Sequence, residues 1–157
     1  MKMRFLTMVA AVALLAACES APDSSKGATG AGAGAAPIVP GSQADFVANV
    51  GDRVFFDYDK YSLAPAARDQ LAKWVAFLKK YPNDKLVVEG HADERGTREY
   101  NLALGERRAN SIKQFLVAQG IQAARLKTIS YGKERPAVLG STEAAWSQNR
   151  RGVGVIQ

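Results

Sequence analysis

The clearest chemical pattern in the sequence lies in the stretch 90–110, which reads GHADERGTREYNLALGERRAN. Its first half carries the acids Asp93, Glu94 and Glu99, and its second half carries Arg108. A carboxylate can bind an ammonium group, and a guanidinium can bind a carboxylate through two parallel hydrogen bonds. An acid and an arginine on neighbouring elements could therefore grip a zwitterion. The plainer alternative is a solvated salt bridge between Asp93 and Arg108, which would contribute little to stability.

A helix is expected to position part of this pattern. Asn101 and Arg108 are seven residues apart, which places them two turns apart on one helix face. Gly105 lies between them, although a glycine inside a helix costs about 0.5–1 kcal/mol relative to alanine. Two explanations are open: close approach of a ligand, or close packing of the helix against the sheet or a neighbouring loop. Arg108 is expected to lie away from the packing face, because the apolar side chains face elsewhere; these are Leu102, Ala109, Ile112 and Leu116.

The same residues do not form a recognisable catalytic or metal site. His91 is the only histidine and Cys18 the only cysteine, whereas a metal site normally needs three or four convergent ligands. We therefore expect no metal, and we interpret His91 as a hydrogen-bonded loop residue. Asp93 and Glu94 are adjacent, whereas the two carboxylates of a glycosidase flank a bond about 5–10 Å apart. Because no serine or cysteine nucleophile is paired with His91 in a known motif, an enzyme is not expected.

The first 18 residues predict export and lipid attachment. Lys2 and Arg4 precede an apolar run from 5 to 17, which is short for a membrane span and typical of a signal peptide. The run ends in Leu-Ala-Ala-Cys, which resembles a bacterial lipobox, where cleavage leaves Cys18 as a lipidated N-terminus. An ordinary secretory signal with a chance cysteine is the alternative. We expect residues 1–17 to be removed and the chain to be anchored by its acyl chains.

Residues 18–45 are predicted to be the lipidated cysteine and a flexible tether. The run SSKGATGAGAGAAP at 24–37 lacks the bulky apolar groups that could offset the entropy of ordering. A coil of this length has a root-mean-square reach of roughly 25–30 Å. Such a tether would let a folded domain leave the membrane surface and meet another layer.

Residues 46–157 are expected to form one domain, because about 110 residues is a common size for a single core. Once Lys2 and Arg4 are removed, the 21 basic residues become 19, against 15 acidic ones. This small excess is scattered, and no aromatic platforms are interleaved with it, so a nucleic-acid partner is not expected.

Hydrophobic periodicity predicts alternating strands and helices in this domain, and hence a two-layer α/β (α+β) sandwich. Strands are predicted at 53–58, 85–89, 126–131 and 152–156. Helices are predicted from an N-cap at Ser62 to a stop at Tyr81, from 97 to 119 with Gly120 as the stop, and from 142 to 149. The first of these helices carries an apolar stripe formed by Ala67, Leu71, Trp74 and Leu78.

In order and content, these motifs closely resemble those of OmpA-like peptidoglycan-binding domains. The resemblance covers about 110 of the 157 residues. The shared motifs are FFDYDKY at 55–61, GHADERGT at 90–97, EYN at 99–101, LGERRAN at 104–110, YGKE at 131–134, PAVLG at 136–140, EAAW at 143–146 and NRR at 149–151. Together with the lipobox and tether, they resemble the lipid-anchored members of the Tol–Pal system. The implied OmpA-like fold is a mixed β-sheet with helices packed on one face.

The resemblance also implies roles for individual residues. The aspartate that matches Asp93 receives the ammonium group of diaminopimelate, a residue of the cell-wall stem peptide. The arginine that matches Arg108 binds its carboxylate, and the asparagine that matches Asn101 supports the site. Arg107 does not match the ligand arginine and is expected to pair with a nearby acid. Further backbone and side-chain contacts are implied for one loop, formed by Asp57, Tyr58 and Asp59.

The function implied by the resemblance is non-enzymatic and requires no cofactor. The chain would bind peptidoglycan and link it to the outer membrane, within the Tol–Pal system of envelope integrity and cell division. Cys18 would hold it at the periplasmic face of the outer membrane, and Glu19, in place of an aspartate that favours inner-membrane retention, favours this location. TolB and other Tol proteins are the implied protein partners, with TolB competing for much the same surface as the wall. Two alternatives are an adaptor that binds only proteins and a cell-wall hydrolase.

Overall fold

The computed structural model describes residues 37–157. The predicted signal peptide, Cys18 and most of the predicted tether lie outside the described residues. None of the helices in the described part of the chain is long and apolar enough to cross a membrane.

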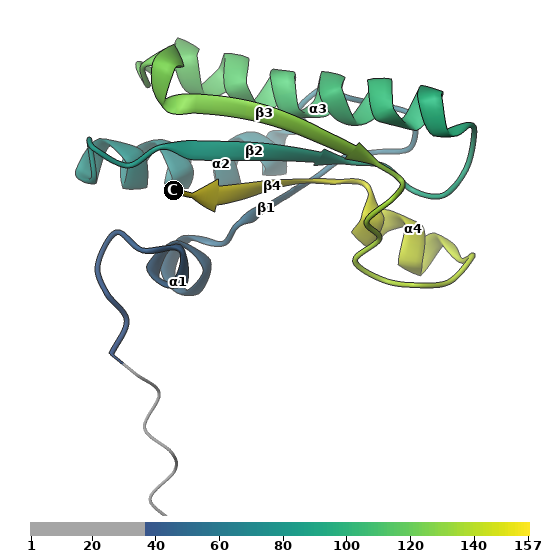
Figure 1. The fold of residues 1–157 in the computed structure, drawn as a ribbon, viewed down its shortest axis with the longest axis horizontal. Coiled ribbons are helices and arrows are strands. Elements are labelled where there is room, and N and C mark those ends of the chain that lie inside the picture. Colours follow the sequence, from purple (N-terminus) through teal and green to yellow (C-terminus); the bar gives the residue numbers. More distant parts are fainter. Residues whose placement is uncertain (1–36) are drawn as a thin grey trace, which may run out of the picture. The chain divides into compact units, whose positions relative to one another are not determined.

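A four-stranded mixed sheet runs through residues 37–157 in the order β1-β4-β2-β3 (Figure 1). Its strands are β1 (Arg53–Phe55), β2 (Leu86–His91), β3 (Leu126–Gly132) and β4 (Arg151–Ile156). β4 pairs antiparallel with both β1 and β2, in a register that sets Gly152 opposite Gly90. β2 and β3 are parallel and are joined by a helix, as a parallel pair requires. The mixed sheet with alternating helices confirms the predicted fold class.

Two long helices pack against one face of this sheet. They are α2 (Pro65–Lys80) and α3 (Arg98–Ala118). Positions two apart on a strand face the same side. A side chain at Gly152 would meet Ile112 of α3, and a side chain at Gly154 would meet Trp74 of α2. Both helices therefore lie over the same face of β4, and the two glycines let them approach that strand closely.

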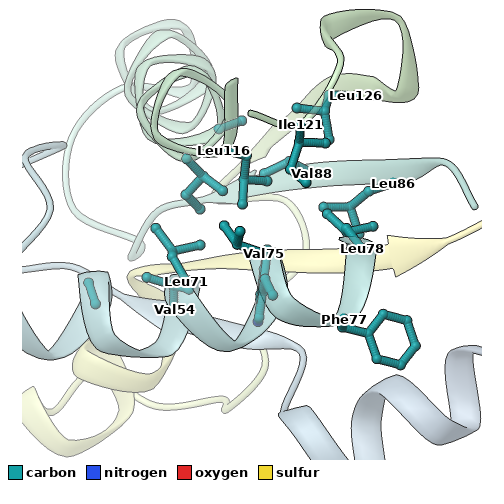
Figure 2. Packing of buried hydrophobic residues seen from close by; sticks show 14 of the residues in the cluster. Val54, Leu71, Val75, Phe77, Leu78, Leu86, Val88, Leu116, Ile121 and Leu126 are labelled. Carbon is teal, nitrogen blue, oxygen red and sulfur yellow. The ribbon is translucent and has the colours of Figure 1, made fainter. Parts of the chain in front are cut away.

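The space between the helices and the sheet is apolar (Figure 2). The stripe predicted on α2 is confirmed, since its four members are buried in this cluster. Leu86 and Val88 face it from β2, and Ile112 and Leu116 face it from α3. Each fully buried side chain of this size contributes about 1.5–3 kcal/mol.

The folded part of the chain begins before residue 46. Its first elements are α1 (Gln43–Asp45) and a π-helical segment (Phe46–Val50). The side-chain amide of Gln43 donates to the carbonyl of Gly154 at 3.3 Å, and its oxygen accepts from the N–H of Ile156 at 2.7 Å. Residues 43–45 were predicted to belong to the tether. The helix was not predicted, because the composition nearby is rich in Gly and Ala and the contacts that hold the helix are with a strand distant in the sequence.

Other element boundaries also differ from prediction. Ser62 is not the cap of α2: the N-cap is Ala64, without a side-chain bond, and Pro65 opens the helix as expected. Leu102 was predicted to be buried but is 47% exposed, since it lies on the outer side of α3. β1 ends at Phe55, three residues early, and β2 continues to His91, into the predicted loop.

The remaining helices are short. They are a 3-10 turn (Ala123–Arg125) and α4 (Glu143–Asn149). Thr142 caps α4 by accepting from the N–H of Ala145, as its position before the helix predicted. α4 leads directly into β4, so the segment before β4 reaches the end of the sheet where β2 stops (Figure 1).

Candidate functional site

The loop after β2 holds a buried carboxylate. Asp93 lies two residues beyond β2 and is only 5% exposed. Its Oδ1 accepts from the backbone N–H and the Nε of Arg95, at 3.1 and 3.2 Å. Its Oδ2 accepts from Nη2 of Arg95 at 2.5 Å and from Nη1 of Arg150 at 3.4 Å. Burial alone would raise the pKa of Asp93, but the hydrogen bonds from Arg95 outweigh it and lower the pKa below its ordinary value.

α3 places a buried cation in the same region. Arg108 is 0% exposed, and its guanidinium donates to three backbone carbonyls. The distances are 2.8 Å from Nε to Lys60, 2.8 Å from Nη1 to His91 and 3.1 Å from Nη2 to Asp57. Burial lowers the pKa of Arg108 to about 10, and the negative charge of Asp93 opposes that shift. Arg108 is therefore charged at neutral pH.

Arg108 has no anionic partner among residues 37–157. The ion pairs of Asp93 are with Arg95 and Arg150, so the salt bridge considered between Asp93 and Arg108 does not form. The prediction that Arg108 lies away from the packing face is wrong, because Arg108 is fully buried and its guanidinium bonds backbone carbonyls of the loop after β1 and of the end of β2. A guanidinium has five N–H donors, of which three are used here. A buried charge without a counterion is costly, so a carboxylate brought to Arg108 would gain a strong partner.

Asn101 secures the acidic loop to the start of α3. It is almost fully buried, and its Nδ2 donates to the carbonyls of Arg95 at 2.8 Å and Thr97 at 3.0 Å. Thr97 is the N-cap of α3 and accepts from the N–H of Tyr100. Asn101 thus supports the loop that carries Asp93, which fits the supporting role expected of it.

The surroundings of Gly105 show which of two explanations holds for it, close approach of a ligand or close packing of the helix. A Cβ at Gly105 would lie 2.8 Å from the carbonyl oxygen of Gly90 and closer still to Oγ of Ser130. A Cβ at Gly90 would collide in turn with the carbonyl of Gly105. The glycine therefore serves close packing of α3 on the sheet, and no space for a ligand is open beside it. This contact sets the depth at which α3 holds Asn101 and Arg108.

The loop after β1 forms one wall of the site. Asp57 contributes its carbonyl to Arg108, and the ring of Tyr58 lies 4.0 Å from the guanidinium carbon of Arg95. Asp59 accepts a hydrogen bond from the hydroxyl of Tyr100 and has a positive φ of 54°, which is uncommon for a residue other than glycine. The side chains of this loop are exposed, so it can meet a ligand.

These elements enclose a cavity of about 170 Å³. Both the buried acid and the buried arginine line it, together with the loop after β1 and the start of α3. The lining residues are Tyr58, Asp59, Asp93, Arg95, Gly96, Tyr100, Asn101, Leu104 and Arg108. Five of the six residues predicted for the ligand site line this cavity, and Asp57 contacts Arg108 behind it. A small zwitterion could thus place opposite charges against Asp93 and Arg108.

Two arginines that hold the site together were not predicted. Arg95 binds Asp93 three times, and Arg150 binds Asp93, the carbonyl of Phe56 and Glu143. Both lie inside motifs that the chain shares with OmpA-like domains, HADERGT and NRR. The only available signal was their charge within those motifs, because the pairing of each arginine depends on which loops meet in the fold.

His91 and Arg107 do not behave as expected. His91 ends β2, and neither ring nitrogen has a hydrogen-bond partner within residues 37–157. Burial, followed by the positive charges of Arg151 and Arg135, lowers the pKa of His91 to about 3, so the ring is neutral. Its backbone carbonyl, not its side chain, serves the site through Arg108.

Arg107 was expected to pair with an acid, yet the described part of the chain brings no carboxylate within ion-pair distance of it. Its guanidinium instead lies 5.5 Å from the ring centre of Tyr61 and 5.8 Å from that of Tyr100. Such cation–π contacts are worth about 0.5–1 kcal/mol at exposed sites.

Within residues 37–157, no group of three or more His, Cys, Asp or Glu side chains could hold a metal ion.

Known proteins share both the sequence and the fold. A family model described as the OmpA family matches residues 55–150. The peptidoglycan-associated lipoprotein of Agrobacterium fabrum is 51% identical over 151 residues, which are 96% of this chain and 84% of that protein. The peptidoglycan-associated lipoprotein of Rhizobium meliloti is 52% identical over 145 residues, covering 90% of this chain and 81% of that protein.

Solved structures extend the likeness to three dimensions. The crystal structure of the peptidoglycan-associated lipoprotein from Burkholderia pseudomallei has a TM-score of 0.66 and 42% identity, covering 68% of this chain and 90% of that one. The C-terminal domain of MotB from Helicobacter pylori has a TM-score of 0.63 at 18% identity, covering 68% and 84% of the two chains. At that identity the MotB likeness concerns the fold alone.

Proposed function

The chain belongs to the OmpA family and, within it, to the peptidoglycan-associated lipoproteins; on this premise we propose that it binds peptidoglycan non-covalently through the diaminopimelate of the stem peptide. The free end of diaminopimelate carries an ammonium and a carboxylate on one carbon atom. The ligand ammonium would bind Asp93, and the ligand carboxylate would bind Arg108.

One observation carries this proposal: among residues 37–157 the buried Arg108 has no carboxylate partner, and the buried Asp93 lines the same cavity. The three carbonyls on Arg108 fix its orientation, but within the described part of the chain its charge is uncompensated and two of its donors are unused. A charge-assisted hydrogen bond contributes about 1.5–3 kcal/mol, so a ligand carboxylate would gain most at this position.

The charge state of the acids favours binding over hydrolysis. A general acid at neutral pH needs a carboxyl with a raised pKa. The pKa of Asp93 is lowered, and hydrogen bonds from Ser141 and Trp146 also lower the pKa of Glu94. Both groups are therefore anions, and Asp93 already accepts four hydrogen bonds. A non-enzymatic binding protein fits this arrangement better than a cell-wall hydrolase.

Calorimetric titration of the purified lipoprotein in detergent, with a stem tripeptide that ends in diaminopimelate, tests the proposal. We expect saturable binding and recovery of the intact peptide. The dipeptide that lacks diaminopimelate is the control and should give no heat of binding. Absence of tripeptide binding would favour an adaptor that recognises only proteins, and cleavage of purified peptidoglycan would favour a hydrolase.

We further propose that Cys18 anchors the chain to the periplasmic face of the outer membrane, as part of the Tol–Pal system. The lipobox-like Leu-Ala-Ala-Cys supports the anchor, and the relatives are lipoproteins by name. A Cys18→Ser strain, fractionated after digestion of its wall, should release the protein from the membrane pellet. Retention in the pellet would contradict the anchor.

TolB is the protein partner that we propose for the same cavity. If TolB and the wall use one surface, the diaminopimelate tripeptide should compete with TolB for the lipoprotein. A pull-down with increasing tripeptide measures this competition. Unchanged capture of TolB at saturating tripeptide would place the TolB surface elsewhere.

A further inference from the structure

The carboxylate of Asp93 has no acceptor position left for a ligand. Each of its oxygens already accepts two hydrogen bonds, and the side chain of Arg95 supplies one on each oxygen. Nε of Arg95 bonds Oδ1, and Nη2 bonds Oδ2, so the guanidinium covers the carboxylate as a two-point contact. A ligand ammonium would need the positions that this side chain occupies.

The guanidinium of Arg95 is held at the mouth of the cavity by two aromatic rings. Its central carbon lies 4.0 Å from the ring centre of Tyr58 and 4.0 Å from that of Trp146. A third contact is weak, since Nη1 lies 3.9 Å from Oε2 of Glu143. The side chain is 30% exposed, so it can leave toward solvent without disturbing the apolar core.

We propose that Arg95 is an internal competitor for the ligand ammonium, and this inference rests on the function proposed above. In the free protein, the guanidinium of Arg95 occupies the ammonium position on Asp93. When the ligand binds, that side chain leaves, while its backbone N–H and Arg150 stay on the carboxylate. These two remaining donors keep Asp93 oriented, so the exchange needs only one side chain to move.

An internal competitor has a defined thermodynamic signature. If only a fraction of the molecules has Arg95 displaced, the apparent affinity of every ligand that uses Asp93 falls by that same fraction. Removing the competitor therefore raises the apparent affinity for all such ligands by one common factor. A residue that contacts the ligand directly would instead change the affinities of different ligands by different factors.

The test uses the full lipoprotein in detergent, with the diaminopimelate tripeptide and free diaminopimelate as two ligands. Arg95→Met keeps the length of the side chain but removes its donors. We expect it to raise the affinity for both ligands by the same factor of about ten, the combined effect of the ion pair between the partly exposed Arg95 and Asp93 and of two cation–π contacts. Arg95→Lys keeps the charge but loses the two-point contact, so it should raise the affinity for both ligands by a smaller common factor. Arg98→Met is the matched control, because Arg98 is exposed and, among residues 37–157, forms an ion pair only with Glu134. The affinities of this variant should equal those of the wild type.

Tryptophan fluorescence gives an independent readout of the displacement. Trp146 loses its stacked guanidinium when Arg95 leaves, whereas Trp74 is fully buried in the core. Saturating ligand should therefore change the emission of the wild type, and Arg95→Met should show that change before any ligand is added.

The outcomes separate this inference from the proposed function. If the wild type binds neither ligand, the proposed function itself fails. If the wild type binds while Arg95→Met has unchanged or weaker affinity, or tightens the two ligands unequally, Arg95 is not a competitor and the binding function stands. Thermal melts test whether each variant is folded. If Arg95→Met does not fold, the affinities of Arg95→Lys decide whether Arg95 is a competitor.

Discussion

The domain has two interiors that are built in opposite ways. Between α2 and the sheet, the buried side chains are apolar, and Leu71, Trp74 and Leu78 are 0% exposed. Between the first half of α3 and the loop after β2, the buried side chains include three polar ones, Asp93, Asn101 and Arg108. The first interior is stabilised by the area it removes from water, without regard to direction. The second is held by individual hydrogen bonds of fixed geometry.

The contrast separates what stabilises this domain from what it can recognise. Burying charged groups costs desolvation free energy, and apolar replacements of such groups are often neutral or stabilising. Stability therefore does not explain why Arg108 is buried without a counterion among residues 37–157, whereas the anionic ligand that we propose would explain it. Substitutions in the apolar interior should change the free energy of unfolding, and substitutions in the polar interior should change ligand affinity.

The largest expected effect is on stability in the apolar interior. Leu71→Ala should lower the free energy of unfolding by about 2–5 kcal/mol, because it removes apolar contacts and leaves a cavity. The folded fraction should keep wild-type affinity for the diaminopimelate tripeptide, since Leu71 lies outside the site. Urea denaturation and titration at low temperature measure the two quantities. Leu102→Ala, at an exposed position of α3, should stay within about 0.5 kcal/mol of the wild type.

The next effect is on affinity in the polar interior. Arg108→Ala should weaken tripeptide binding by about 1.5–3 kcal/mol, the contribution of a charge-assisted partner. A tripeptide with lysine in place of diaminopimelate lacks the carboxylate, so the wild type should lose a similar amount with it. The two losses should not add, because they remove the same contact. Four titrations complete this cycle, and full additivity would place carboxylate recognition elsewhere.

Arg108 also tests whether the two interiors are separable. Arg108→Ala leaves the carbonyls of Asp57, Lys60 and His91 without their donor, so it should also lower stability. Arg108→Lys keeps a charge but cannot reach three carbonyls in one plane. It should bind more weakly than the wild type and melt above Arg108→Ala. A melting temperature of Arg108→Ala equal to that of the wild type would show that these bonds add nothing to folding.

A smaller loss of stability is expected where the two interiors meet. Alanine normally stabilises a helix relative to glycine, by about 0.5–1 kcal/mol. Gly105→Ala should nevertheless destabilise, by about 1–3 kcal/mol of overpacking, because its Cβ would press on Gly90 and Ser130. Thermal melts measure the sign. A stabilised Gly105→Ala would mean that α3 can move away from the sheet without cost.

The smallest effect is expected in the pH dependence of stability. The pKa of Asp93 is lowered in the folded state, so its contribution is fully present above the unfolded value of about 3.9 and is lost as the pH falls through the lower, folded-state pKa. Asp93→Asn lacks this contribution. Melting temperatures from pH 7 to pH 2 should therefore fall more steeply for the wild type than for Asp93→Asn. Parallel curves would mean that the ion pairs of Asp93 do not contribute to folding.

The apolar interior could be predicted from the sequence, and much of the polar interior could not. Leu71 and Trp74 recur at helical spacing, so periodicity alone identified their face of α2. Asp93 and Arg108 stood out by charge and spacing, and their expected ligand roles came from motif resemblance, which names residues but not their partners. The pairing of Asp93 with Arg95 and Arg150 depends on where separate loops meet, and no spacing in the chain encodes it.

Burial of a polar side chain is also invisible to hydrophobic periodicity. Arg108 was assigned to an exposed face because the apolar pattern of α3 runs elsewhere, although three carbonyls enclose it. The helix at Gln43 was missed for a similar reason. Its stabilising bonds reach Gly154 and Ile156, more than a hundred residues away, so its local composition resembles a linker.

The contact between Gln43 and the end of β4 has a mechanical consequence. The chain enters the folded part beside Gly154 and Ile156, whereas Arg150, just before the other end of β4, binds Asp93 of the cavity. If the N-terminus is held by a membrane and the cavity by the wall, tension between the two layers would run along β4. That strand is hydrogen-bonded on both sides, to β1 and to β2. A pull along its axis strains many of these bonds at the same moment, instead of opening them one after another, and a sheet resists this direction of force better than peeling.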